Sequence, residues 1–492
     1  TLPAQESRFP GFEALRDFSY EKENNHVCPF CTNNCNRTLI RFSDGSTFVT
    51  GNRCERGEVV GEVGDPETRS RLKEAERRLR GAEDLFSRRE KLLFKEYPVE
   101  AIEPGKELTI GLPRVLEFWN SGPFWSTFFR ALGFQVRFSR PSTRELYESG
   151  IALVPSDTIC FPAKLAHGHM EDLISTGVDR IFMPIMNRMP PENSRLKSDH
   201  LCAVVKGYPM VLDVSNEPSE GHGIPFDKPI FHWLDERTRF RQLSDFMAAT
   251  FGTPSRHVQA ALAQADGVQR SIFGGLREEA SRILEGLSGS EFAVVLAGRP
   301  YHSDPLVSHS VSRFFTSHGI PVIPLDALPG LEEVEHEGIR AEGTINFHVR
   351  MLSGAVKVAQ HHHLELVQIV SFGCGHDAVL TDEVIRIMRT AAGREPLTLK
   401  LDESDADGPI QIRVRSFIET VRSRREKGDG FEPKELKDPY PVKYQRPHRS
   451  EKVILAPNVS EAFARIASAA IRKEGYRIEP LPLADERAIA LG

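Results

Sequence analysis

Short apolar segments recur along this chain in a constant order. Each copy begins with an apolar strand, passes a loop with Gly or Pro, continues as an amphipathic helix, and enters a second strand after a Gly. The first strands lie at residues 108–113, 292–298 and 453–457, and the second strands at 134–138, 320–323 and 476–478. This order is typical of parallel sheets. We therefore predict an α/β fold with two doubly wound, Rossmann- or flavodoxin-like parallel-sheet lobes and the start of a further unit.

The stretches between these copies predict how the chain is divided. Charge-rich residues with Leu at helical spacing indicate a connecting helix, and a segment rich in Lys, Pro, Arg and Asp indicates a linker. We expect a four-cysteine hairpin module at 1–66, a charged connecting helix at 67–104, a first α/β lobe at 105–215, a helical connection at 216–289, a second α/β lobe at 290–425, a linker at 426–450 and a truncated α/β unit at 451–492. Since a half-built sheet exposes an unpaired edge, we expect the natural protein to continue beyond Gly492.

The N-terminal segment carries a tight cysteine group beside a predicted β-hairpin at residues 38–42 and 47–50. The group consists of Cys28, Cys31, Cys35 and Cys54. The first pair is separated by two residues, which places two sulfurs close enough for one metal, and the hairpin can return the last cysteine to the same point. Four thiolates complete a tetrahedral zinc site or hold a [4Fe–4S] cluster. The spacing leaves both metals open, and such a closed site favours a structural or electron-relay role.

Composition limits the compartment and the partners. The 492 residues carry a net charge of -6, with 40% hydrophobic and 27% charged residues, as in a globular protein. This charge gives no reason to expect a nucleic acid or an anionic membrane as partner. No apolar run approaches the ~20 residues that cross a bilayer. The seven cysteines do not suggest a disulfide framework, and the N-terminus has no secretory signal, so we expect the cytoplasm.

Three further cysteines, Cys160, Cys202 and Cys374, stand alone in the sequence. Cys160 follows the apolar segment 151–154, which we predict to be a strand, and Cys374 follows the apolar strand 367–371. Cys202 lies near another strand end. Ligand sites of open α/β sheets form at the carboxyl ends of strands, which favours a shared site. A lone cysteine is, however, more often a small buried apolar residue, and spacing alone leaves that alternative open.

At these residues the sequence resembles the large proteins related to acyl-CoA dehydratase activases, whose middle region is an uncharacterised domain. That domain is related to the D-component subunits of 2-hydroxyacyl-CoA dehydratases and benzoyl-CoA reductases. The resemblance lies in the segments CPFCTNNC, GNRCERG, IGLPRVLEFWNSGPFW, SDTICFPAKLAHGHMEDL, VVLAGRPYHSDPLVSHSV, VSFGCGHDAVLTDEV and PLTLKLDESDADGPIQIRVRSFIE, which span most of residues 26–420.

This resemblance implies a [4Fe–4S] cluster held by Cys160, Cys202 and Cys374, with the fourth iron open to substrate. It also implies two kinds of partner: an ATPase of the actin/hexokinase-like fold that feeds single electrons to the cluster, upstream in the same polypeptide or as a separate protein, and a homologous dehydratase-like subunit or domain. The chain contains neither a P-loop nor the Asp-Gly phosphate motif of such ATPases. If ATP is used, it therefore binds outside these 492 residues.

Further polar residues near the cysteines are candidates for the chemistry. His167 follows Cys160 on a predicted helix and can donate a proton or a hydrogen bond. Arg299, Tyr301 and His302 lie in the loop after the first strand of the second lobe, where a substrate-binding or sulfur-bonding group is expected. Asp377, three residues after Cys374, is a similar candidate. The alternative for each is an ordinary structural role.

Three functions remain open from the sequence. The first is an iron–sulfur redox enzyme that uses ATP-driven, low-potential electrons to reduce or dehydrate a small substrate, with an acyl-CoA as a candidate. The second is a non-catalytic electron relay or metal-stabilised scaffold within an activase. The third is a zinc-binding α/β protein without a redox role. The first requires thiols that are far apart in the sequence to meet in the folded chain.

Overall fold

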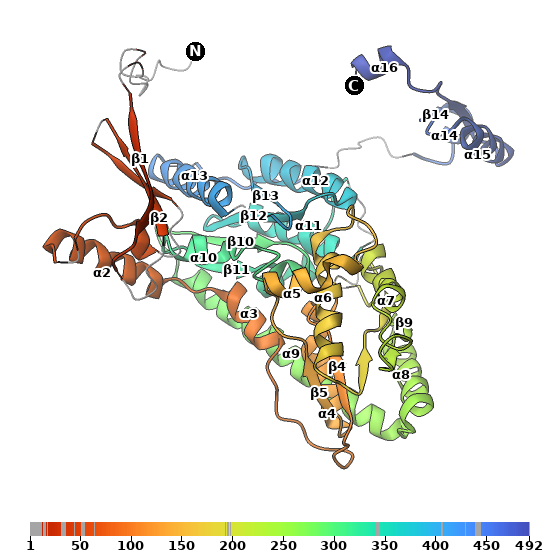
Figure 1. Cartoon of the computed structure of the whole chain (residues 1–492). Helices are drawn as coiled ribbons and strands as arrows, with labels where there is room; N and C mark the ends of the chain where they lie inside the picture. Colours follow the sequence, from red (N-terminus) through yellow and green to blue (C-terminus); the bar gives the residue numbers. More distant parts are fainter. Residues whose placement is uncertain are drawn as a thin grey trace. The chain divides into compact units, whose positions relative to one another are not determined.

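The computed structural model describes the chain with several gaps. The described residues are 12, 16, 18–30, 36–43, 45–50, 55–62, 64–191, 193, 196, 198–340, 345–404, 407–428, 430–437 and 444–491, without the side chains of 74–81, 407 and 489. The fold is mixed α/β, with parallel sheets and helices (Figure 1). Contacts divide the chain into two compact units, Thr1–Leu436 and Lys437–Gly492. Among the described residues, no helix is both long and apolar enough to cross a membrane.

The first parallel sheet has the strand order β5-β4-β6-β8. Its strands are Gln135–Phe138 (β5), Thr109–Leu112 (β4), Arg180–Phe182 (β6) and Phe226–Asp227 (β8). A separate parallel pair, Ile185–Arg188 (β7) and Ile230–His232 (β9), continues beyond β6 and β8. The helices of this region are Phe118–Ala131 (α4), Arg144–Gly150 (α5), Phe161–Ser175 (α6), Ala203–Ser215 (α7) and Glu236–Phe251 (α8).

The second parallel sheet has the corresponding order, β11-β10-β12-β13. Its strands are Val322–Pro324 (β11), Ala293–Ala297 (β10), Leu364–Ser371 (β12) and Leu397–Leu401 (β13). The α-helices around it are Val311–Thr316 (α10), Asn346–Ala359 (α11), Gly375–Ala392 (α12) and Asp407–Glu426 (α13), and the short 3₁₀ turns are Pro300–Ser303 (η3), Leu325–Ala327 (η4) and Leu331–Glu333 (η5). The predicted parallel sheets are confirmed. The finer expectation of two doubly wound lobes stays a prediction, since both sheets belong to one compact unit.

Aromatic side chains dominate the core of the first sheet. Trp125 of α4 contacts Phe182 of β6 with ring centroids 4.7 Å apart, and Phe231 and Trp233 stack beyond it. Helix α4 tolerates Pro123 and lies close to the preceding helix, because a side chain at Gly122 would come within 3.3 Å of the Leu93 carbonyl oxygen. Large rings bury much apolar area, which fixes α4 against the sheet.

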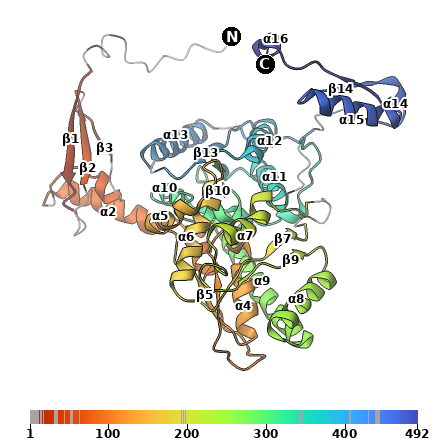
Figure 2. The same cartoon turned by 45° about the vertical axis from the view of Figure 1, so that its right-hand side comes forward.

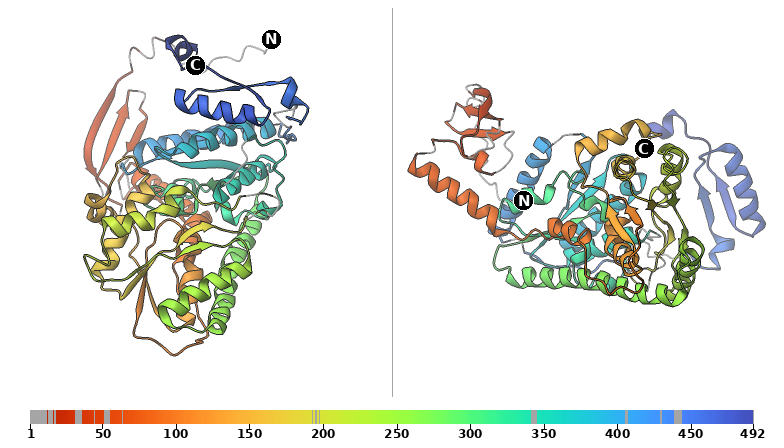
Figure 3. Two further views of the ribbon diagram at one scale, coloured as in Figure 1. Left: turned by 90° about the vertical axis from the view of Figure 1, so that its right-hand side faces the viewer. Right: turned by 60° about the horizontal axis from the view of Figure 1, so that its bottom comes forward.

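One long helix, Ser255–Gly286 (α9), serves the cores of both sheets. Its first half contributes Val258 and Ala265 to the aromatic core, and its second half contributes Ile272 and Leu276 to the core of the second sheet. Figure 3 shows this long green helix beside both sheets. At ~1.5 Å per residue it is nearly 50 Å long. The two sheets therefore share a single rigid element.

The remaining elements lie near the two ends of the chain. An antiparallel sheet contains Tyr20–Val27 (β1), Asn36–Phe42 (β2) and Thr47–Thr50 (β3), which confirms the predicted hairpin, and a short turn follows at Glu55–Glu58 (η1). Cys31, Cys35 and Cys54 lie outside the described residues, so the four-cysteine module stays a prediction. The second unit pairs Val453–Ala456 (β14) with Arg477–Pro480 (β15) in parallel and includes His448–Glu451 (α14), Glu461–Lys473 (α15) and Glu486–Leu491 (α16).

Two local predictions were wrong. The apolar segment 151–154, expected as a strand, begins with a 3₁₀ turn at Ile151–Leu153 (η2) directly after α5. There the chain packs against α6, since a side chain at Gly150 would lie 2.2 Å from the Gly168 nitrogen. The single charged helix is two helices, Pro66–Gly81 (α2) and Leu85–Leu93 (α3), because Asp84 caps a new start at the Ser87 amide. The segment 216–289, expected as a helical connection, contains helices α8 and α9, and it also contains strands β8 and β9 before them.

Loops at the carboxyl ends of β5 and β10 meet, so the carboxyl edges of the two sheets face each other. The Ser142 hydroxyl, after β5, donates to Asp304, after β10. His169 of α6 lies 3.0 Å from Ser142 Oγ through Nε2 and 2.7 Å from Ser139 Oγ through Nδ1. Helices α5 and α6, which lie side by side, border this seam (Figure 2). Burial raises the pKa of Asp304 to about 6, above its ordinary value of 3.8.

We expect Asp304 to make stability depend on pH. Since the folded-state pKa is raised, the folded protein favours the protonated carboxyl. The folding free energy gained from this preference is lost as pH rises from about 4 to about 7. The loss amounts to at most about 3 kcal/mol, at about 1.4 kcal/mol per pKa unit. Urea unfolding of Asp304→Asn should show a flatter stability profile across this range than the wild type. The exposed Asp245→Asn serves as control, and equal slopes for the Asp304 variant and the wild type would contradict the expectation.

Candidate functional site

Each of the three lone cysteines begins a helix. Cys160 is the N-cap residue of α6, Cys202 of α7 and Cys374 of α12, and none of these caps makes a side-chain hydrogen bond to the helix. The first turn of a helix carries free backbone N–H groups and a partial positive charge. Each sulfur is therefore placed at the positive end of a helix, which favours a negatively charged occupant.

The three cysteines share one neighbourhood. Burial raises the pKa of Cys160 to about 11, and the charges of Cys202 and Cys374 add to the rise, while Arg299 opposes it. The loops before α6 and α12 are adjacent, because a side chain at Gly373 would lie 3.9 Å from the Thr158 carbonyl oxygen. Gly373 has φ +76°, a left-handed conformation that favours glycine.

The loop before Cys202 is hydrogen-bonded to the segment that begins α11, a helix beside the second sheet. His200 forms a parallel bridge with Ile345, and its carbonyl oxygen accepts a 2.9 Å hydrogen bond from the Asn346 amide at the start of α11. Segments from both sheet regions therefore enclose the site.

Arg299 is the buried centre of this site. Its guanidinium donates to both carboxylate oxygens of Asp377, at 2.7 and 3.0 Å, and to His348 Nε2 at 3.0 Å. The same Nη2 atom lies 3.4 Å from the Cys374 sulfur. Burial would raise the pKa of Asp377, but the Arg299 charge outweighs it and lowers that pKa below its ordinary value. Burial lowers the pKa of His348 to about 3, so His348 is a neutral acceptor.

His302 uses both ring nitrogens to hold the loop that carries Arg299. Its Nδ1 accepts from the Arg299 amide at 3.2 Å, and its Nε2 lies 2.9 Å from the Ser371 hydroxyl. Burial lowers the pKa of His302 to about 3. These bonds leave no free nitrogen for proton transfer and favour a positioning role.

His167 connects the helices that carry Cys160 and Cys202. Its Nε2 lies 3.0 Å from the Tyr208 hydroxyl of α7, and its Nδ1 lies 2.8 Å from Asn216 Oδ1. The Asn216 amide nitrogen faces the His167 carbonyl oxygen and Glu171, so its oxygen must face the ring. His167 Nδ1 therefore carries the proton, and Tyr208 donates to Nε2. Sequence reasoning missed Tyr208 and Asn216, since no local pattern marks them.

Tyr301 extends from η3 into the aromatic core of the first sheet, where Cys202 and Cys160 also pack. Burial raises the pKa of Tyr301 well above its ordinary value, with Arg299 opposing and Cys202 and Cys160 adding to the rise. Of the sequence-predicted candidates, the structure thus gathers Cys160, Cys202, Cys374, Arg299 and Tyr301. His302 and His167 lie behind them as supports.

A site for a single metal ion is not formed by the described residues. Among them, no group of three or more His, Cys, Asp or Glu side chains comes close enough to hold one ion. Cys28 is buried, and the three other cysteines of its group lie outside the described part of the chain. The zinc or second cluster expected there stays a prediction.

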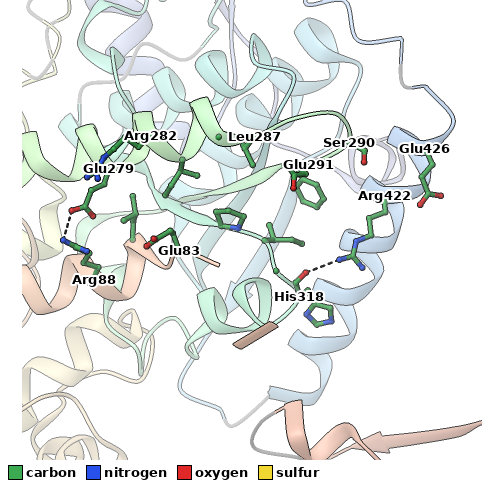
Figure 4. Close-up of a pocket in the computed structure, with 17 residues that line it drawn as sticks. Glu83, Arg88, Glu279, Arg282, Leu287, Ser290, Glu291, His318, Arg422 and Glu426 are labelled. Atoms are coloured by element: carbon green, nitrogen blue, oxygen red, sulfur yellow. Dashed lines mark hydrogen bonds and ion pairs between the residues drawn. The ribbon is translucent and has the colours of Figure 1, made fainter. Parts of the chain in front are cut away.

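A cavity of about 740 Å³ lies at the opposite, amino edge of the second sheet (Figure 4). Phe292 and Pro321, which precede β10 and β11, line it. Two of its arginines have partners: Arg88 pairs with Glu279 at 2.7 Å, and Arg422 donates to the His318 carbonyl oxygen at 3.2 Å. None of the candidate residues lines this cavity, so it is distinct from the cysteine site.

The fold and this site define an α/β protein with three cysteines at facing sheet edges. The family model described as "CoA enzyme activase uncharacterised domain (DUF2229)" matches residues 109–328, and this region of the chain is accordingly related to CoA enzyme activases. The match covers the first sheet, Cys160, Cys202 and the Arg299–Tyr301 loop, but not Cys374.

Other comparisons are weaker. No curated protein matches the chain. A solved structure of the SBP FpvC from P. aeruginosa with Ni²⁺ is 13% identical over 66% of this chain and 98% of its own, with a TM-score of 0.20. A structure of ZnuA is 12% identical over 65% of this chain and 99% of its own, with a TM-score of 0.17. Similarities at these TM-scores carry no argument about fold or function.

We expect Asp377→Ala to destabilise the protein strongly, because Arg299 would remain buried without its counter-charge. Breaking one side of a buried ion pair costs about 3–5 kcal/mol. Urea unfolding measures the change, and Glu395→Ala is the matched control because Glu395 forms an exposed pair with Arg389. A loss of stability for Asp377→Ala no larger than that of the control would show that the pair is dispensable.

Proposed function

We propose that Cys160, Cys202 and Cys374 hold a [4Fe–4S] cluster and that the chain is an iron–sulfur redox protein. It receives low-potential electrons and uses them to reduce or dehydrate a small substrate, for which an acyl-CoA is the candidate. The observation that carries this proposal is the placement of three cysteines at three helix N-termini in one neighbourhood.

The residues fit such a cluster in charge. Three thiolates with their cluster carry net negative charge, which the helix ends and the Arg299 guanidinium stabilise. Metal replaces the proton that burial holds on the Cys160 thiol, so binding releases a proton. A single tetrahedral zinc would need sulfurs about 4 Å apart. A cube of four irons accepts sulfurs that lie farther apart.

The surrounding residues have separate tasks. A cluster with three protein ligands supplies one-electron transfer and an open iron that can hold a substrate oxygen. Arg299 donates to the Cys374 sulfur, which stabilises added negative charge and raises the reduction potential. Asp377 and His348 hold Arg299 in place. His302 and the His167–Tyr208 bond fix the elements that carry Arg299, Cys160 and Cys202.

The proposed partners follow from the matched family. We propose that an actin/hexokinase-like ATPase module, in the same polypeptide or a separate one, delivers the electrons, and that a homologous dehydratase-like subunit or domain takes part in the reaction. The domain's description as a CoA enzyme activase domain supports the dehydratase partner. We also propose that neither a nucleic acid nor a membrane is a partner and that the protein is located in the cytoplasm.

Anaerobic iron and sulfide analysis tests the cluster. We expect about four irons per chain beyond any held by the N-terminal cysteine group, and their loss in Cys160→Ala, Cys202→Ala and Cys374→Ala, because each thiolate holds one corner. Cys28→Ala is the matched control and should keep these irons.

Two results would contradict the proposal. Iron that survives Cys160→Ala but is lost in Cys28→Ala would indicate an electron relay or scaffold built on the N-terminal group. Zinc without iron would indicate an α/β protein without redox chemistry.

A further inference from the structure

One polar group at the cysteine site has no partner. The Tyr301 side chain is only 4% exposed, yet its hydroxyl forms no hydrogen bond within the part of the chain that the structure describes. The hydroxyl oxygen is not fully enclosed by protein atoms, so solvent or a ligand can reach it. A buried tyrosine hydroxyl normally has a partner, because an unmet hydrogen bond is costly.

Comparable groups of the same region follow that rule. Trp119 Nε1 donates to the Arg114 carbonyl oxygen at 2.9 Å, the Tyr208 hydroxyl bonds His167, and the Tyr97 hydroxyl donates to the Leu92 carbonyl oxygen at 2.8 Å. Tyr301 differs from all three. Its ring is held firmly, edge-on to His302 with centroids 5.2 Å apart, so the free hydroxyl has a fixed position.

The surroundings identify the space that this hydroxyl faces. Tyr301 packs in the same core cluster as Cys202 and Cys160, and it follows Arg299 by two residues in η3. Arg299 has committed Nη1 and Nη2 to Asp377, His348 and the Cys374 sulfur, and its Nε is fully enclosed. The Tyr301 hydroxyl therefore carries an uncommitted proton that a ligand can reach. Since an ordinary phenol has a pKa near 10, it keeps that proton at neutral pH.

We propose that Tyr301 is the substrate-binding residue of the cysteine site, where its hydroxyl donates a hydrogen bond to the carbonyl or hydroxyl oxygen of a small substrate. This inference rests on the proposed function and deepens it by naming the group that the site recognises. Phe372 and Val379, which stand on either side of Cys374 in the sequence, are about two-thirds exposed and would offer apolar surface to the remainder of the substrate. The substrate class is thus a carbonyl or hydroxy compound with an apolar remainder.

The test uses the full chain with reconstituted iron and the substitution Tyr301→Phe. Acetone and 2-propanol serve as probes for a carbonyl and a hydroxyl oxygen. The EPR spectrum of the reduced cluster should change with at least one probe in the wild type. In Tyr301→Phe the half-saturating concentration should rise about tenfold, the loss expected for one hydrogen bond. Iron content and the spectrum without probe should be unchanged.

Tyr97→Phe is the matched control, since it removes a hydroxyl that is bonded to Leu92 outside the site. It should respond to the probe as the wild type does. The inference is overturned if the wild type responds to neither probe, or if Tyr301→Phe responds with wild-type affinity. It is also overturned if Tyr301→Phe loses iron or alters the spectrum without probe, because the hydroxyl would then support the cluster itself. Failure of the proposed function is separate: the wild type would bind no iron that depends on Cys160.

Discussion

The cysteine site depends on one ion pair that is enclosed by protein. Arg299 and Asp377 are almost completely buried, and moving such charges out of water costs several kcal/mol for each ion. Two hydrogen bonds between them and one to His348 offset that cost. Because the same guanidinium also reaches the Cys374 sulfur, the pair connects β10, which precedes Arg299, to the start of α12. The geometry at the carboxyl edge of the second sheet follows from this pair.

The region of the first sheet contributes two cysteines to the same site. Its cysteines stand at the starts of α6 and α7, and the His167–Tyr208 bond holds these helices together behind the sulfurs. The Ser142–Asp304 bond then brings the edges of the two sheets together. A site assembled from three helix starts and two sheets has a strong common polarity, because every helix turns its positive end toward it. That polarity favours a negatively charged occupant between the three helix starts.

The sequence allowed the parallel strands to be predicted where a local signal exists. The runs that became β4, β5, β10, β11, β14 and β15 are apolar and are separated by Gly stops, and the structure has them as parallel strands. The apolar run after Gly150 carries the same signal but forms a turn, because close contact with Gly168 leaves no room for a strand pairing. Strand β8 has only two residues, too few for a pattern.

The cysteines and the loop after β10 could be named as candidates from the sequence. Cys374 and the Arg299 loop do follow strands β12 and β10, whereas the strand expected before Cys160 is a turn. The supports of the site could not be predicted in the same way. His348 binds Arg299 from α11, and Asn216 orients His167 from the end of α7. Neither residue is near its partner in the sequence, and such contacts arise only from tertiary packing.

Helix α9 has a consequence for how the molecule unfolds. A single unbroken helix is anchored by Val258 and Ala265 in one core and by Ile272 and Leu276 in the other. A helix anchored at one end only would fray from the other, since long helices in water owe most of their stability to tertiary packing. Melting of either core therefore withdraws support from its neighbour. The two sheets behave as one cooperative folding unit despite their separate cores.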